Sequence, residues 1–119
     1  MSKFPMSLFR IEQLRKIDLS ENAITRFPSL KEEASIVSLK LNDNNISNVS
    51  GPDLLKFKNI QYLYFKGNSN LKELPKEITQ LTKLKNLDLR KTAMARNYGK
   101  IQKLQKAMPD TRIYYFSKK

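Results

Sequence analysis

The side chains that most often carry out catalysis are scarce in this sequence. The chain contains no His and no Cys, so it lacks the commonest general base, a thiolate nucleophile and a zinc–thiolate site. Asp18 and Asp88 belong to distant parts of the sequence pattern, too far apart for paired acid–base work. The three glycines, Gly51, Gly67 and Gly99, do not form a phosphate-binding loop. The sequence therefore predicts a non-enzymatic protein without a metal ion or a cofactor.

Non-covalent recognition is the chemistry that the remaining side chains favour. Tyr62 and Tyr64 are two residues apart in a predicted strand, so both point to the same side, with Lys40 and Lys66 nearby. Tyrosine and arginine are enriched at the hot spots of protein interfaces. An outward tyrosine can equally be a good strand former that packs on its cross-strand neighbours, so both interpretations stay open. The candidate partner-binding residues are Asp18, Lys40, Tyr62, Tyr64, Lys66, Asp88, Arg90, Arg112 and Tyr114.

A repeated pattern predicts the elements that must position these side chains. Apolar residues recur with similar spacing in four segments that begin at Leu14, Ile36, Ile60 and Leu84, at intervals of 22 to 24 residues. A period of this length indicates a repeat architecture. The fourth and sixth positions of each segment are apolar and alternate with polar residues, which predicts a strand with one buried face. Because one such strand cannot bury its face alone, we expect the strands to stack side by side in a parallel sheet.

The ninth position of each unit carries a polar side chain just after the predicted strand. The residues at this position are Asn22, Asn44, Asn68 and Thr92. An amide donates and accepts hydrogen bonds at once, so it can satisfy backbone groups that leave the strand pairing at the turn. We therefore expect a structural column between successive units, in which Thr92 makes fewer bonds than the asparagines.

Four units in register resemble leucine-rich repeats, and the resemblance covers nearly the whole chain. The segment Leu74-Pro75-Lys76-Glu77-Ile78-Thr79-Gln80-Leu81 looks like part of the short repeats of bacterial and plant-like proteins, and Cys-rich caps are absent. The resemblance implies an α/β solenoid with parallel strands on its concave side. It also implies a protein that acts mostly as a binding surface.

The repeat positions divide a chain whose length of 119 residues predicts one domain. Residues 4–14 match residues 74–84 position for position, so residues 1–13 are predicted to be a partial repeat. The full repeats are predicted at 14–35, 36–59, 60–83 and 84–99, with a C-terminal cap at 100–119. A start within a repeat predicts an open N-terminal edge, through which the chain could associate with another copy or a missing segment.

The predicted cap follows a turn at Asn97-Tyr98-Gly99. Apolar residues at Ile101, Leu104 and Met108 predict a helix over 100–108 with one buried face. Residues 112–116 are predicted to form a terminal strand. Such a cap would cover the last open face of the stack, as atypical terminal repeats do in solenoids.

The net charge of +12 leaves the class of partner open. Acidic outward residues lie in the first two units and basic ones in the later units, which favours a protein partner with a matching gradient. Clustered lysines could also bind phosphates, although no recognition helix, stacking platform or zinc pattern is visible. The leading prediction is a module that binds an unknown protein or peptide on the concave face. The alternatives are polyanion binding (nucleic acid or an anionic surface) through the basic convex and C-terminal surface, and a structural segment of a larger solenoid.

The sequence also bears on the compartment. No apolar run approaches the ~18 residues of a membrane-spanning helix, and no signal peptide is visible. The absence of cysteine fits a reducing compartment. These features predict a cytoplasmic protein.

Overall fold

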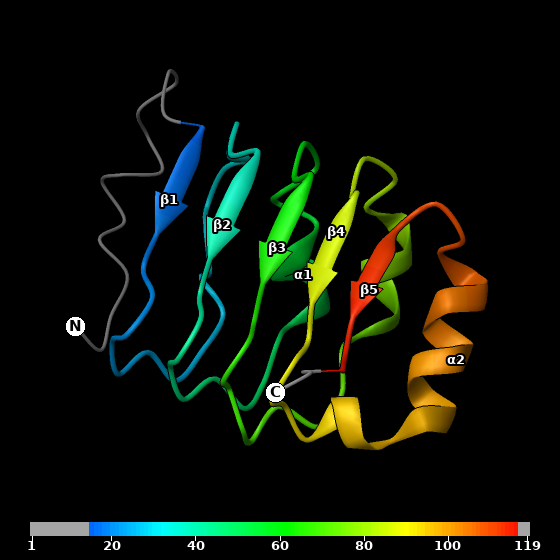
Figure 1. Cartoon of the computed structure of the whole chain (residues 1–119). Coiled ribbons are helices and arrows are strands. Elements are labelled where there is room, and N and C mark those ends of the chain that lie inside the picture. The colour runs from blue at the N-terminus through cyan, green and yellow to red at the C-terminus, as the bar shows by residue number, and fades with distance from the viewer. Residues whose placement is uncertain (1–14, 117–119) are drawn as a thin grey trace.

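One parallel sheet organises the computed structural model, which describes residues 15–116 (Figure 1). Its strands are β1 (Lys16–Asp18), β2 (Ser38–Lys40), β3 (Tyr62–Tyr64), β4 (Asn86–Asp88) and β5 (Arg112–Tyr114). Each strand pairs with the next one along the chain, so the order in space is the order in sequence. This arrangement is an α/β solenoid, in which each repeat contacts its neighbours, as the repeat pattern predicted.

The strands return through segments with little regular structure. Their helical parts are α1 (Gly51–Leu54), the 3₁₀ helices η2 (Lys76–Gln80) and η3 (Met94–Arg96), and α2 (Tyr98–Ala107). Pro52 lies in the first turn of α1, where a proline costs no hydrogen bond. In Figure 1, α1 lies behind the sheet, and α2 flanks it past β5, at the C-terminal end of the stack.

The prediction for the final helix was slightly wrong at its start. The segment 97–99 was expected to be a turn, but α2 begins at Tyr98. The side chain of Asn97 accepts a hydrogen bond of 3.1 Å from the backbone N–H of Lys100. An asparagine at this place satisfies a free amide of the first helical turn, so Asn97 caps the helix and residues 98 and 99 join it.

A continuous apolar core lies on one side of the sheet. The middle residue of every strand is buried, and so is the apolar residue two positions further along the first four repeats. These inward residues are Ile17, Leu19, Leu39, Leu41, Leu63, Phe65, Leu87, Leu89 and Ile113. The return segments close the core from the other side, for example through the edge-to-face contact of Phe27 with Phe57 at 5.3 Å between ring centroids. The alternation along each strand therefore leaves the opposite side of the sheet uncovered by the core.

The amides at the ninth position connect successive repeats. The side-chain oxygen of Asn68 accepts from the backbone N–H of Ile46 at 2.9 Å. Its amide nitrogen donates to the carbonyl of Leu41 at 2.9 Å and to that of Phe65 at 2.8 Å. Asn68 is completely buried. It therefore satisfies backbone groups of its own repeat and of the preceding one.

The other members of the column differ in their reach. Asn44 bonds backward in the same way, because it donates to the carbonyl of Leu19 at 2.9 Å and accepts from the N–H of Ile24 at 3.1 Å. The hydroxyl of Thr92 donates to the carbonyl of Leu89 at 2.7 Å and accepts from the N–H of Ala95 at 3.2 Å. A hydroxyl has one donor, whereas an amide has two. These bonds of Thr92 accordingly stay within its own repeat.

The predicted partial repeat over 1–13, with its open edge, lies outside the described residues. Within residues 15–116, no helix combines the length and the apolar character that crossing a membrane requires.

Candidate functional site

The uncovered side of the sheet presents two columns of side chains. Strand pairing aligns the third positions of the repeats with one another, and likewise the fifth positions. We call this surface the open face; its residues are Lys16, Ser38, Tyr62, Asn86 and Arg112 in one column and Asp18, Lys40, Tyr64, Asp88 and Tyr114 in the other. Neighbouring strands lie about 4.8 Å apart, so adjacent members of a column can touch.

Tyr64 lies at the centre of the second column. The ammonium nitrogen of Lys40 is 5.6 Å from the centroid of its ring, within the range of a cation–π contact. Burial raises the pKa of the Tyr64 hydroxyl above its ordinary value, and the nearby Tyr62, Asp88 and Tyr114 raise it further. Tyr64 is half-buried, so part of its ring remains open to a partner.

Asp88 is buried, which corrects its expected exposure on this face. Only 2% of its surface is exposed. One carboxylate oxygen accepts from Arg90 Nη2 at 2.7 Å, and the other accepts from Arg90 Nε at 2.9 Å and from the Arg90 backbone N–H at 3.1 Å. The sequence pattern assigned Asp88 to the outer surface correctly, but Arg90 folds back over it. Asp88 therefore positions Arg90 and is not itself available as a contact.

Arg90 links this ion pair to the last strand. Its guanidinium carbon is 6.0 Å from the centroid of the Tyr114 ring. The hydrogen bond from Arg90 to Asp88 raises the pKa of the guanidinium, so the group stays charged. A bidentate carboxylate fixes the plane of a guanidinium, and the fixed plane lies near the aromatic ring. The row Lys40, Tyr64, Arg90 and Tyr114 thus continues across the sheet.

The remaining predicted site residues surround this row. Tyr62 is half-buried beside Tyr64, and Arg112 is exposed on the neighbouring column. The backbone N–H of Lys66 donates to the side chain of Asn42 at 3.1 Å, which ties the turn after β3 to the preceding repeat. Asp18 is exposed on β1, where it accepts from the backbone N–H of Ser20 at 3.0 Å. Strand pairing places Asp18 directly beside Lys40, so Asp18 joins the column that continues through Tyr64.

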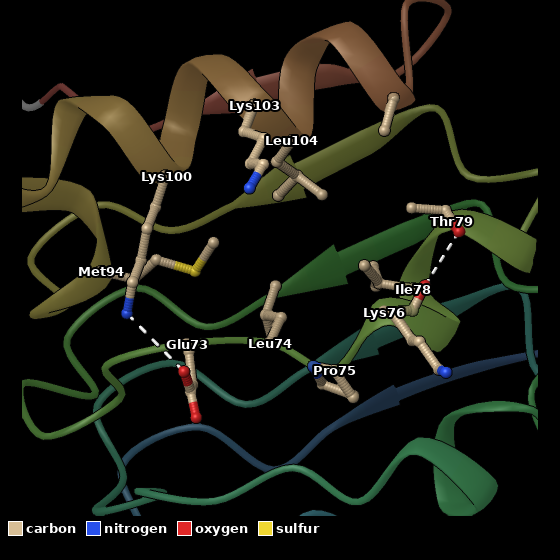
Figure 2. A pocket seen from close by; sticks show the side chains of 11 residues that line it. Glu73, Leu74, Pro75, Lys76, Ile78, Thr79, Met94, Lys100, Lys103 and Leu104 are labelled. Carbon is tan, nitrogen blue, oxygen red and sulfur yellow. Dashed lines mark hydrogen bonds and ion pairs between the residues drawn. The ribbon is translucent and has the colours of Figure 1, made fainter.

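A groove that the repeat pattern did not predict lies on the other side of the repeats. The groove lies between η2 and α2 and has a volume of about 370 Å³ (Figure 2). Leu74, Ile78, Met94 and Leu104 line it with apolar side chains. The 24-residue spacing of Lys76 and Lys100 was a usable signal, because residues one period apart hold equivalent places in the segments that follow successive strands.

Metal-binding chemistry has no candidate in the part of the chain that the structure describes. No group of three acidic side chains there could hold a metal ion. The open face instead offers aromatic rings, cations, the paired carboxylate of Asp88 and the exposed carboxylate of Asp18. Such a surface can bind a ligand without reacting with it.

Comparison with known proteins gives matches of different extent. No protein-family model matches the chain. The chain is 34% identical over 84 residues to leucine-rich repeat serine/threonine-protein kinase 1 of Mus musculus, a match that covers 71% of this chain and 4% of that protein. The chain therefore spans a small fraction of the mouse protein. A match of this extent does not assign the kinase activity of the mouse protein to this chain.

One solved structure in particular shares the fold. A chain of the crystal structure of the Drosophila melanogaster SNF/U2A' complex has a TM-score of 0.78 and 24% identity, over 92% of this chain and 63% of that chain. A more distant LRR protein of Leptospira interrogans has a TM-score of 0.49 and 19% identity, over 95% of this chain and 40% of that one. The structure has one parallel strand per repeat and side-chain amides that bond from one repeat to the preceding one. Together with the fold shared with the Drosophila chain and the match to the mouse protein, these features identify the chain as a leucine-rich repeat protein.

Proposed function

We propose that this leucine-rich repeat protein binds a protein or peptide ligand on the open face of its sheet, over β2 to β5. The leucine-rich repeat fold supports an interaction module in general. The choice of face rests on the row formed by Lys40, Tyr64, Arg90 and Tyr114. This row is the single observation that carries the proposal.

The row is suited to binding because much of it is already held in place. Asp88 fixes Arg90 through two side-chain bonds, at 2.9 and 2.7 Å. Lys40 and Arg90 lie near the Tyr64 and Tyr114 rings, respectively. Side chains that are ordered before binding lose less conformational entropy when a ligand arrives. Aromatic and arginine side chains in such positions are typical of binding hot spots.

The charges of the open face indicate the ligand's character. Lys40 and Arg112 are exposed, while the Asp88 carboxylate is paired with Arg90. Asp18 is the acidic member of this face that remains exposed, and it lies on β1. A complementary ligand would place carboxylates over β2 to β5 and apolar groups against Tyr62 and Tyr64. Such a match of opposite charges favours fast and selective association.

The alternatives set out from the sequence predict different behaviour. A polyanion would be attracted by lysines on any side of the molecule, and its binding would weaken steeply with salt. A segment that only extends a larger solenoid would bind no separate ligand on the open face. The row of aromatic and cationic side chains favours a defined protein ligand over both alternatives.

Substitution of the two central tyrosines tests the proposal. A tagged form of the chain would be used to capture partners, and the dissociation constant of each captured partner would then be measured for the wild type and for Tyr62→Ala/Tyr64→Ala. We expect the double variant to weaken binding by about tenfold or more, because each ring supplies apolar area at the centre of the contact.

The matched control is Tyr98→Ala, which removes an exposed tyrosine from α2, away from the open face. It should bind like the wild type. Circular dichroism should show that all three proteins are folded. Equal affinity of a folded double variant and the wild type would reject the open face as the binding site.

A further inference from the structure

The groove between η2 and α2 combines an apolar floor with a basic rim. Ile78, Met94 and Leu104 are buried in its floor, and Leu74 is half-buried beside them. Three lysines border the groove: Lys76 belongs to η2, and Lys100 and Lys103 belong to α2. Figure 2 shows Lys103 reaching from α2 toward the groove and Lys76 on the η2 side.

The cations at this rim are incompletely neutralised. Lys100 Nζ lies 3.7 Å from a carboxylate oxygen of Glu73 and donates to the carbonyl of Lys72 at 3.2 Å. The structure shows no ion pair of Lys76 or Lys103 within residues 15–116. The lining contains a single acidic side chain, that of Glu73. The groove therefore carries a net positive charge around an apolar centre.

The size of the groove limits what can fill it. Ligand pockets in proteins commonly measure about 300–1,000 Å³, and this groove measures about 370 Å³. It can take a few apolar side chains but not a folded domain. Amphipathic helices bind in such grooves through apolar residues three or four positions apart, while their polar face remains in solvent.

We propose that this groove binds an acidic amphipathic helix of a partner protein, at a site separate from the open face. Apolar side chains of the helix would lie against Ile78, Met94 and Leu104. Its carboxylates would pair with Lys76, Lys100 and Lys103. The inference is independent of the proposed function, because it involves none of the open-face residues.

Other occupants fit these observations less well. A second copy of the chain would meet strong repulsion, since each copy carries a net charge of +12. Single-stranded nucleic acid is usually held by aromatic side chains on which its bases stack. The lining has no aromatic residue on which a base could stack. Phosphate groups would gain no favourable contact from its apolar floor. Apolar floor and basic rim together favour an acidic peptide.

Titration with a defined peptide tests the proposal. The probe is a fluorescent helical peptide of about 16 residues, with leucines at helical spacing and glutamates elsewhere; a peptide with the same composition in scrambled order and an oligothymidylate serve as comparisons. Binding to the full chain would be followed by fluorescence anisotropy. NMR would follow the methyl groups of Ile78, Met94 and Leu104, as well as the ring signals of Tyr64. We expect the helical peptide to bind more tightly than the other two probes and to shift the methyl signals.

Two kinds of variant separate the apolar and the ionic contributions. Lys76→Glu/Lys103→Glu reverses the charge of the rim and should weaken peptide binding by about tenfold or more. Lys31→Glu/Lys106→Glu makes the same change in net charge at exposed residues that do not line the groove, and should weaken it much less. Ala107→Trp places a bulky ring at the exposed edge of the groove and should block the peptide with every charge retained.

The outcomes decide between the occupants. Equal losses for the two charge-reversed variants, or unchanged binding to Ala107→Trp, would show general attraction to anions and overturn the proposal. Tighter binding of the oligothymidylate, no binding of the helical peptide, or shifts at Tyr64 without shifts at Met94 would overturn it as well. The Tyr62→Ala/Tyr64→Ala variant should bind the peptide normally, so the two proposed sites can fail separately.

Discussion

At the scale of single residues, the turn after each strand depends on an uncommon backbone conformation. Glu21, Asp43 and Lys91 have φ angles of 58°, 56° and 58°, and Gly67 occupies the same position in the third repeat with 86°. A side chain in this left-handed region costs roughly 1–2 kcal/mol because its Cβ crowds the following carbonyl. The bend lets the side chain of the next residue, an asparagine or Thr92, bond to a backbone carbonyl of the same turn. Each non-glycine turn is therefore a local source of strain that the tertiary structure maintains.

Lys91→Gly should stabilise the protein. Glycine adopts positive φ freely, so the substitution should raise the free energy of unfolding by about 0.5–1 kcal/mol, measured by urea denaturation. Lys85→Gly is the matched control, because Lys85 is also exposed but does not have a positive φ. There, glycine should lower the free energy of unfolding. A loss of stability of the same size in both variants would contradict the argument.

At the scale of the elements, the strands are too short to hold their own pairing. Each of the five strands has three residues. Hydrogen bonds beyond their ends continue the alignment, such as those from the N–H of Phe65 to the carbonyl of Asp88 at 2.8 Å and from Asp43 to Lys66 at 2.7 Å. The side-chain amides of the ninth positions add bonds at the turn. Repeats are thus connected along a line much longer than the strands themselves.

Asn68→Ala should strongly destabilise the protein. It would leave the carbonyls of Leu41 and Phe65 and the N–H of Ile46 without this partner. An unsatisfied buried group costs about 1–3 kcal/mol, so we expect a total loss of roughly 2–5 kcal/mol in the free energy of unfolding. Thermal and urea denaturation would measure it.

Asn70→Ala is the matched control for this prediction. Asn70 is exposed and donates to the side chain of Asn45 at 3.2 Å. Its loss should change the free energy of unfolding by less than about 0.5 kcal/mol. Similar stability of Asn68→Ala and Asn70→Ala would show that the hydrogen bonds of the buried Asn68 side chain do not contribute to the free energy of unfolding.

At the scale of the whole molecule, the repeats form a linear stack with different neighbours at its middle and at its end. Among the described strands, β3 is paired on both sides, whereas β5 is paired only with β4. The stability of a solenoid is approximately a sum over repeats and the interfaces between them. Opening of β5 therefore breaks fewer contacts than opening of β3.

Ile113→Ala should loosen the C-terminal end before the middle. The N–H of Leu89 donates to the carbonyl of Tyr114 at 2.6 Å, and that of Leu41 donates to the carbonyl of Tyr64 at 2.9 Å. Native-state hydrogen exchange should become faster at Leu89 than at Leu41 in this variant, because the substitution removes buried contacts of β5. Equal acceleration at both amides would show that the stack opens only as a single unit.

The sequence by itself determined the features that depend on local spacing. Its period and alternation predicted the parallel strands, their register and the inward residues such as Leu39 and Leu63, because a side chain's face follows directly from its place in a strand. The similarity to known proteins confirms the leucine-rich repeat family, while the cytoplasmic location and the binding role of the open-face residues stay predictions. Only the tertiary structure decided that Arg90 covers Asp88 and that η2 and α2 enclose a groove. Those contacts join side chains from different turns and repeats, so they depend on rotamers and packing that no periodicity encodes.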